Sequence, residues 1–382
     1  MAERILKNIS SRGLKNAVRG NEYRREASIS YGILIGGYIL LQILTAAGLI
    51  GHNLQGQFVP ICCYISLAVS LNLVVGISGE LSLGHAGFMA IGAFSGILMS
   101  RILLQGGMSF QPGILLISIL FGAFMATIAG FIIGIPILGL RGDYLAIVTL
   151  AFGEIIRNFL NVLFFGFVDG KLKFAFNHMI DGIDNSDRII TGAIGATGTK
   201  TMASFTWGLV LCLFTVFIVL NLKNSKQGRA IMSIRDNRIA GESIGLDVRK
   251  YKLMAFVVSA ALAGMAGCLF GLNYSTLVPV KFNFNTSVLI LVFVVLGGVG
   301  NIWGGIIAAI VLTLLPELFR QFADYRMLTY AVVLILVMIS TYNPAIKARV
   351  DGIWKKINPF AKRKAESGKG RKNRRKSGKE AE

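Results

Sequence analysis

The chain has 382 residues, of which 54% are hydrophobic and only 15% are charged, with a formal net charge of +20 at pH 7. Soluble domains carry a charge on about a quarter of their residues, so this composition excludes an ordinary soluble protein. It predicts instead an all-α polytopic membrane protein.

Apolar runs that are long enough to cross a bilayer as helices recur along the chain. We predict about ten transmembrane helices, with a range of about 8–11 because several runs are short or broken by Gly or Pro. The expected spans are residues 29–50, 58–78, 83–104, 114–139, 143–165, 205–222, 252–273, 285–299, 303–319 and 327–342.

Nearly all of the excess positive charge lies in three segments, at residues 1–28, 223–252 and 345–382. Loops rich in Lys and Arg remain in the cytoplasm, and ten spans place all three segments there, with the loop 166–203 outside. The predicted domains are a basic cytoplasmic N-terminal segment (1–28), a transmembrane domain (29–342) and a basic disordered cytoplasmic tail (343–382). We expect the tail to lie on anionic membrane lipid, and we do not expect nucleic acid as a partner.

No sequence pattern typical of a catalytic site is evident. The cysteines lie singly or adjacent within apolar runs, and the three histidines are scattered, so we predict no metal site, no cofactor and no catalytic residue. The nearest approach to a phosphate loop, GATGTKT at 195–201, lacks the required Gly-Lys-Ser/Thr order. If ATP drives this protein, another chain binds it.

Two Gly-rich breaks interrupt the apolar segments, GISGELSLGHAG at 76–87 and GGVGNIWGG at 297–305. Non-helical backbone at membrane depth is tolerated only where protein or a water-filled cavity satisfies it, and paired breaks of this kind indicate a transport pathway. The alternative is that both breaks are tight cytoplasmic turns. The candidate pathway residues in the breaks are Ser82, Gly84, His85, Gly87, Gly297, Gly298 and Gly300.

Two further patterns concern helix faces. Glu154 and Arg157 lie on one face of the fifth expected span, where they can pair, either along a pathway or as a structural ion pair. Small residues at every fourth position of the seventh span predict close packing against another helix. These are Ser259, Ala263, Gly267 and Gly271.

The segment 223–252 has the pattern of a short amphipathic helix with an apolar face of isoleucines. Gly228 and Gly245 bracket it as helix ends. Periodicity alone leaves open whether this helix docks into a partner or lies on the membrane surface. The isoleucines are Ile231, Ile234, Ile239 and Ile244.

Four stretches carry a resemblance to a known family. Residues 228–267, GRAIMSIRDNRIAGESIGLDVRKYKLMAFVVSAALAGMAG, resemble the coupling loop and following helix of the LivM-like permeases of branched-chain amino-acid ABC importers. Residues 71–93, 140–158 and 294–309 resemble other stretches of that family in the expected order.

The resemblance implies a non-catalytic subunit that imports leucine, isoleucine and valine across a bacterial or archaeal plasma membrane. Its expected partners are a second homologous permease, two ATP-binding-cassette ATPase subunits and an extracytoplasmic binding protein. Four further candidates for the pathway are Asp143, Tyr144, Glu154 and Arg157. The candidate residues for ATPase coupling are Gly228, Arg229, Arg235, Asp236, Asn237 and Gly245.

The outer loop departs from the family pattern. The family's Thr-Gly-Gly-Pro-Asn-Gly-like stretch is replaced by TGAIGATG at 191–198, after an unusual insert at 169–188. Urea and amide permeases share much of the same pattern, so the same importer class with urea or short amides as substrate is an alternative. An ion-coupled secondary transporter, and a channel or membrane anchor that uses the basic tail, are rivals from other classes.

Overall fold

The computed structural model describes residues 2–49, 51–137, 144–168, 171–176, 188–318 and 335. The expected tenth span, 327–342, and the basic tail, 343–382, lie outside the described residues except for position 335.

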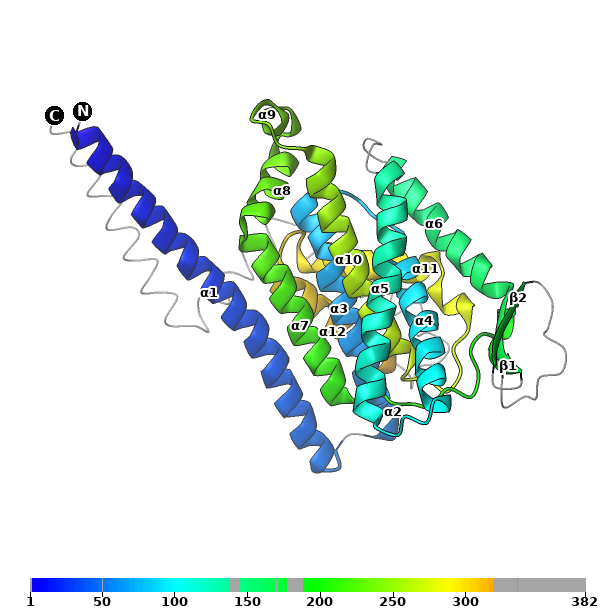
Figure 1. Ribbon diagram of the computed structural model, residues 1–382. Coiled ribbons are helices and arrows are strands. Elements are labelled where there is room, and N and C mark those ends of the chain that lie inside the picture. The colour runs from blue at the N-terminus through cyan, green and yellow to red at the C-terminus, as the bar shows by residue number, and fades with distance from the viewer. Residues whose placement is uncertain are drawn as a thin grey trace. The chain divides into compact units, whose positions relative to one another are not determined.

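Long helices dominate the described chain (Figure 1). They are α1 (Ala2–Ala46), α3 (Phe58–Asn72), α4 (His85–Gln105), α5 (Gln111–Ile137), α7 (Phe205–Asn224) and α10 (Val248–Gly271). The other helices are α2 (His52–Gln55), α6 (Tyr144–Asn161), α8 (Lys226–Asp236), α9 (Arg238–Ser243), α11 (Phe284–Gly297) and α12 (Ile302–Leu318). A π-helical turn, η1 (Leu73–Ser78), continues α3, and two 3-10 turns are η2 (Gly192–Ile194) and η3 (Pro279–Phe282).

Among the described residues, 6 helices are long and apolar enough to cross a membrane. They are Arg24–Ala46, Phe58–Ser78, His85–Gln105, Gln111–Ile137, Phe205–Asn224 and Val248–Gly271. α11 and most of α12 are apolar but shorter. The chain is therefore a multi-pass membrane protein, while the count of about ten spans stays a prediction.

Glycines on α4 and α10 allow these two helices to touch backbone to backbone. A side chain at Gly92 would collide with the backbone of Gly264, and one at Gly267 would collide with the carbonyl of Met89. Gly264 also leaves room for Ala126 of α5. The predicted close packing of the seventh expected span is confirmed, because small residues bring the helix axes together.

The all-α prediction was wrong for the segment after α6. Three antiparallel strands, β1 (Leu163–Val168), β2 (Lys171–Phe176) and β3 (Arg188–Thr191), form a sheet of order β2-β1-β3. The fifth expected span accordingly ends as a helix at Asn161. Aromatic residues in LFFGFV and the alternation in KLKFAF favour extended backbone. Strand pairing therefore overrides the apolar character that suggested a longer helix.

Candidate functional site

The segment between α7 and α10 forms two helices rather than the single predicted one. Asn237 is extended (φ −155), and its side-chain oxygen accepts a hydrogen bond from Ala240 N at 3.1 Å, which starts α9 immediately after α8. Ser225 similarly caps α8 by accepting from Gly228 N at 3.0 Å. Gly228 thus lies in the first turn of α8, and Gly245 follows α9.

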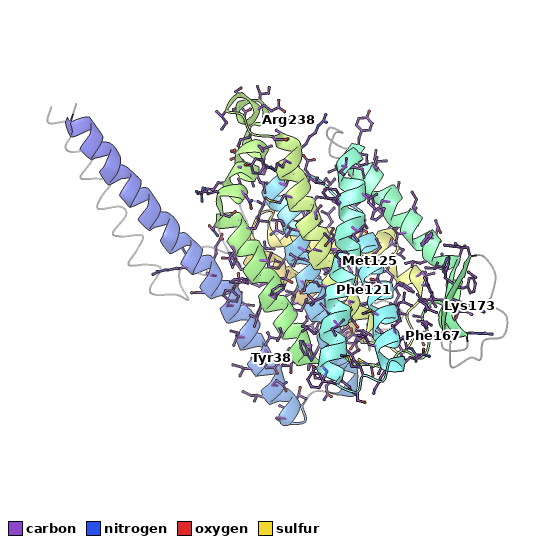
Figure 2. The ribbon with its side chains drawn as sticks, viewed as in Figure 1. Tyr38, Phe121, Met125, Phe167, Lys173 and Arg238 are labelled. Carbon is purple, nitrogen blue, oxygen red and sulfur yellow. The ribbon has the colours of Figure 1, made fainter. Side chains whose placement is uncertain are left out.

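The isoleucines of this segment divide between two environments. Ile231 and Ile234 on α8 are buried against the bundle, whereas Ile239 is 77% exposed and Ile244 is 73% exposed. The prediction of one continuous apolar face was therefore wrong, since the chain turns between the helices at Asn237. α9 forms a tip at one end of the bundle (Figure 1), where Arg238 projects (Figure 2).

Arg235, at the end of α8, joins this segment to the first Gly-rich break. Its guanidinium donates to the carbonyl of Gly76 at 2.7 Å and pairs with Asp236 at 2.9 Å. Arg229, six residues earlier, donates to the carbonyl of Asn224 at 2.9 Å, at the end of α7. Two of the predicted coupling residues thus link α8 to other elements, Arg235 to η1 and Arg229 to the end of α7.

The two Gly-rich breaks lie in contact with each other. Gly300 N donates to the side-chain oxygen of Asn72 at 2.8 Å, and a side chain at Gly76 would collide with Gly300. The second break is a tight turn between α11 and α12, in which Gly298 and Gly300 have positive φ (90 and 83). Gly297, the last residue of α11, lies against the backbone of Gly304 and Gly305, which supports the turn interpretation for this break.

The first break is more than a turn. After η1, residues 79–84, here called the re-entrant segment, lead to the start of α4. His85, the first residue of α4, lies 2.8 Å from Ser70 Oγ through its Nε2. Ser70 lies near the end of α3 but near the middle of the longer span Phe58–Ser78, so α4 begins beside the middle of that span. Ser82 and Gly84 of the re-entrant segment are buried, whereas Gly79 and Leu81 are exposed.

Buried hydroxyl groups surround the start of α4. Ala86 N donates to Ser287 Oγ at 3.2 Å, Leu83 N donates to Thr149 Oγ1 at 3.0 Å, and Ser259 Oγ donates to the carbonyl of Ser70 at 2.6 Å. These groups come from α11, α6 and α10, and sequence reasoning missed them as site residues. The sequence pattern that could have identified them is an isolated Ser or Thr within an apolar span. Most such residues, however, form hydrogen bonds only with the backbone of their own helix.

Ser82 lies within the re-entrant segment and is buried. Its hydroxyl, like that of Ser78, has no hydrogen-bond partner among the described residues. Gly84 and Gly87 pack against the backbone of Thr149 and Gly153 on α6, where a side chain would not fit without displacement. The structure therefore brings four of the predicted pathway residues, Ser82, Gly84, His85 and Gly87, into one place.

The predicted pair on α6 forms. Arg157 lies 2.7 Å from Glu154, whose other oxygen accepts a hydrogen bond from Phe284 N at 3.2 Å. The carboxylate thus joins α6 to the start of α11. Tyr144 is largely exposed at the start of α6, and Asp143 lies outside the described residues.

A cavity of about 530 Å³ lies between α4, α5, α6 and the sheet. Phe121 and Met125 of α5, labelled in Figure 2, are among its almost entirely apolar lining. The Ser95 hydroxyl in the lining donates to the carbonyl of Ile91 at 2.6 Å. Because an amino-acid zwitterion requires polar partners for both charges, this cavity is unsuited to one. Within the described part of the chain, no group of three or more His, Cys, Asp or Glu could hold a metal ion.

The arrangement defines a membrane protein in which irregular, Gly-rich backbone enters a helical bundle and touches an amphipathic loop helix. Residues 56–341 match the family described as the permease component of branched-chain amino acid transport systems. The chain belongs to this family.

Three relatives illustrate the similarity. The branched-chain amino acid permease LivM of Escherichia coli (strain K12) is 38% identical over 288 residues, covering 72% of this chain and 66% of LivM. LivH of Salmonella typhimurium (strain LT2) is 22% identical, with 72% and 88% covered, and the nucleoside permease NupB of Lactococcus lactis is 26% identical, with 65% and 70% covered. The match with LivM thus spans slightly less than two thirds of that relative. No solved structure matches the chain.

Proposed function

We propose that this chain is a membrane-spanning permease subunit of an ABC importer for leucine, isoleucine and valine. Its partners are a second homologous permease, two ATP-binding-cassette ATPase subunits and an extracytoplasmic binding protein that delivers the substrate. The chain works in a bacterial or archaeal plasma membrane with both termini in the cytoplasm. ATP hydrolysis takes place on the partner subunits.

The observation that carries this proposal is the two-sided character of the α8–α9 segment. One side is bound to the first Gly-rich break through Arg235 and Gly76. The other side presents Ile239 and Ile244 to the surroundings, next to the exposed ion pair of Arg238 and Glu242. A small apolar surface with a charged rim suits docking onto a separate protein. We assign that surface to the ATPase.

The pathway in this proposal passes along the start of α4. There, irregular backbone and the hydroxyls of Ser82 and Thr149 lie inside the bundle. Transporters commonly bind their substrates at such breaks in helices. Glu154 is a less suitable centre for an ion-coupled mechanism, because Arg157 and Phe284 N already occupy its carboxylate oxygens. This occupancy favours a structural ion pair over a proton relay.

The substrate assignment follows the family and the character of the breaks. Sites built for polar ligands such as urea present several hydrogen-bonding side chains and reject ligands that leave those groups unpaired. The breaks here are mostly glycine and apolar residues, so an apolar amino acid is the better match than urea. The nucleoside permease among the relatives defines a third substrate class to be tested.

The proposal is tested by reconstituting this chain with its partner permease, ATPase subunits and binding protein in proteoliposomes. Uptake of labelled leucine, urea and a nucleoside is measured in parallel, with and without ATP at the ATPase side. We expect ATP-dependent accumulation of leucine. Accumulation of urea or nucleoside without leucine would overturn the substrate, and leucine uptake driven by an ion gradient without ATP would overturn the importer class.

A further inference from the structure

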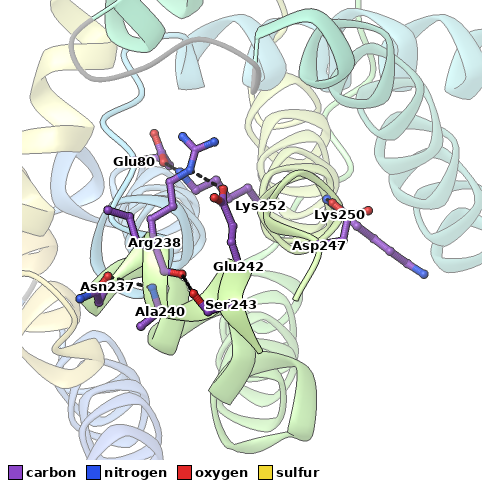
Figure 3. Close-up of polar contacts among 10 residues, drawn as sticks. Glu80, Asn237, Arg238, Ala240, Glu242, Ser243, Asp247, Lys250 and Lys252 are labelled. Atoms are coloured by element: carbon purple, nitrogen blue, oxygen red, sulfur yellow. Dashed lines mark hydrogen bonds and ion pairs between the residues drawn. The ribbon is translucent and has the colours of Figure 1, made fainter. Parts of the chain in front are cut away.

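Charged residues on either side of the α9 tip contact the end of η1 and the start of the re-entrant segment. On the α8 side, Arg235 donates to Gly76 O, and its side chain lies against Gly79. On the α10 side, Lys252 forms an ion pair with Glu80, the second residue of the re-entrant segment (Figure 3). Side chains of α8 and α10, the helices before and after α9, therefore contact the same stretch of five residues, 76–80.

The pair of Lys252 and Glu80 differs in exposure from the charged pair on α9. The two side chains are only 14% and 15% exposed, whereas Arg238 and Glu242 on α9 are 41% and 49% exposed (Figure 3). Partly buried charges that lose a partner leave an unpaired charge in a poorly solvated place, while exposed pairs contribute little. The Lys252–Glu80 pair is therefore suited to resist separation of its two segments.

The pair is also well placed to transmit movement. Lys252 lies one turn into α10, whose first turn is capped by Asp247, which accepts a hydrogen bond from Lys250 N at 3.2 Å. Only four residues, 244–247, separate α9 from α10, so a displacement of the tip is carried into α10 over a short distance. Glu80 is in turn four residues from Gly84, where the start of α4 packs on Thr149.

We propose that Glu80 and Lys252 are positioning residues that couple movement of the α8–α9 tip to the re-entrant segment and to the start of α4. This inference rests on the proposed function and assigns a role to two residues that do not touch ATPase or substrate. When the tip moves with the ATPase, the ion pair draws residues 79–84 along with α10, and Arg235 does the same from α8. The start of α4 then changes its position beside Ser70, which opens or closes the pathway.

The test uses the complete reconstituted complex and measures leucine imported per ATP hydrolysed. The variants are Glu80→Gln, Lys252→Gln and the charge exchange Glu80→Lys with Lys252→Glu. The matched controls are Arg249→Gln and Lys250→Gln, because both residues lie in the first turn of α10, close to Lys252 in sequence, but are exposed and lie outside the surface assigned to the ATPase. For each variant, the yield of detergent-solubilised protein and the temperature of thermal unfolding are also measured. These two quantities distinguish a folding defect from a coupling defect.

We expect each single change at Glu80 or Lys252 to lower the import-to-hydrolysis ratio about fivefold or more while ATP hydrolysis continues. The exchange should restore a large part of the ratio, and the control variants should keep it. A wild-type ratio in folded single variants, an equal loss in the control variants, or a folded exchange variant without recovery would overturn the inference. Uptake by the wild-type complex tests the proposed function separately. If the wild type imports another substrate, the amount of that substrate imported per ATP hydrolysed tests the role of the Glu80–Lys252 pair.

Discussion

Gly79 lies directly against Arg235: a Cβ atom at residue 79 would be 2.5 Å from Cγ of Arg235. Gly79 also has a φ of 77, a conformation that residues with side chains rarely adopt. This contact fixes the end of α8 at the point where the chain leaves η1 for the re-entrant segment. It joins the residue predicted for ATPase coupling to the break predicted for the pathway.

Gly79→Ala should lower transport strongly, because it adds backbone strain of about 1–2 kcal/mol and displaces Arg235 from Gly76. The matched control is Gly107→Ala, since Gly107 has a φ of 81 but no neighbouring atom within 4 Å. Both variants have similar strain, so only Gly79→Ala should uncouple ATP hydrolysis from uptake. Equal losses in the two variants would show that strain alone, not the contact with Arg235, matters.

Gly267→Ala should destabilise the bundle by about 1–3 kcal/mol, the usual cost of overpacking, because its new methyl group would meet the carbonyl of Met89 on α4. Thermal unfolding in detergent measures the effect. Gly36→Ala on α1 serves as the control, as nothing lies within 4 Å of it and alanine favours helix. We expect the control to unfold at the wild-type temperature or above it, and a Gly267 variant that does the same would contradict the close packing of α4 and α10.

Ile239→Asp should weaken binding of the ATPase subunits without affecting the fold, because Ile239 is 77% exposed and contributes little to the core. The conservative change Ile239→Leu is the control, and both variants are compared by co-purification with the proposed ATPase subunits. Loss of an apolar contact at the centre of an interface costs about 2 kcal/mol or more. Unchanged binding of Ile239→Asp would place the ATPase surface elsewhere.

Cysteines introduced at Phe110 and Ile244 should react from opposite sides of the membrane. Phe110 is exposed in the turn between α4 and α5, and Ile244 follows α9. The four native cysteines are buried, so the unmodified chain should react slowly with a membrane-impermeant maleimide. We expect Phe110→Cys to label from outside and Ile244→Cys only after access to the cytoplasmic side. Labelling of both from one side would contradict the proposed orientation.

Local sequence patterns are sufficient to predict the class of the protein and much of its local structure. Apolar runs predicted the six long helices, the spacing of Gly267 and Gly271 predicted a close helix contact, and the spacing of Glu154 and Arg157 predicted their ion pair. These features depend on neighbours within one or two helical turns. Periodicity and composition are therefore sufficient to predict them.

The contacts between residues far apart in the sequence could be found only in the folded chain. Arg235 and Gly76 are separated by 159 positions, and Glu80 and Lys252 by 172, so no local pattern indicates either contact. The strands after α6 and the turn at Asn237 likewise depend on pairing and packing that override helical periodicity. Only the packed bundle brings α8, α10 and the re-entrant segment together, because their contacts are made by burial and hydrogen bonding between separate helices.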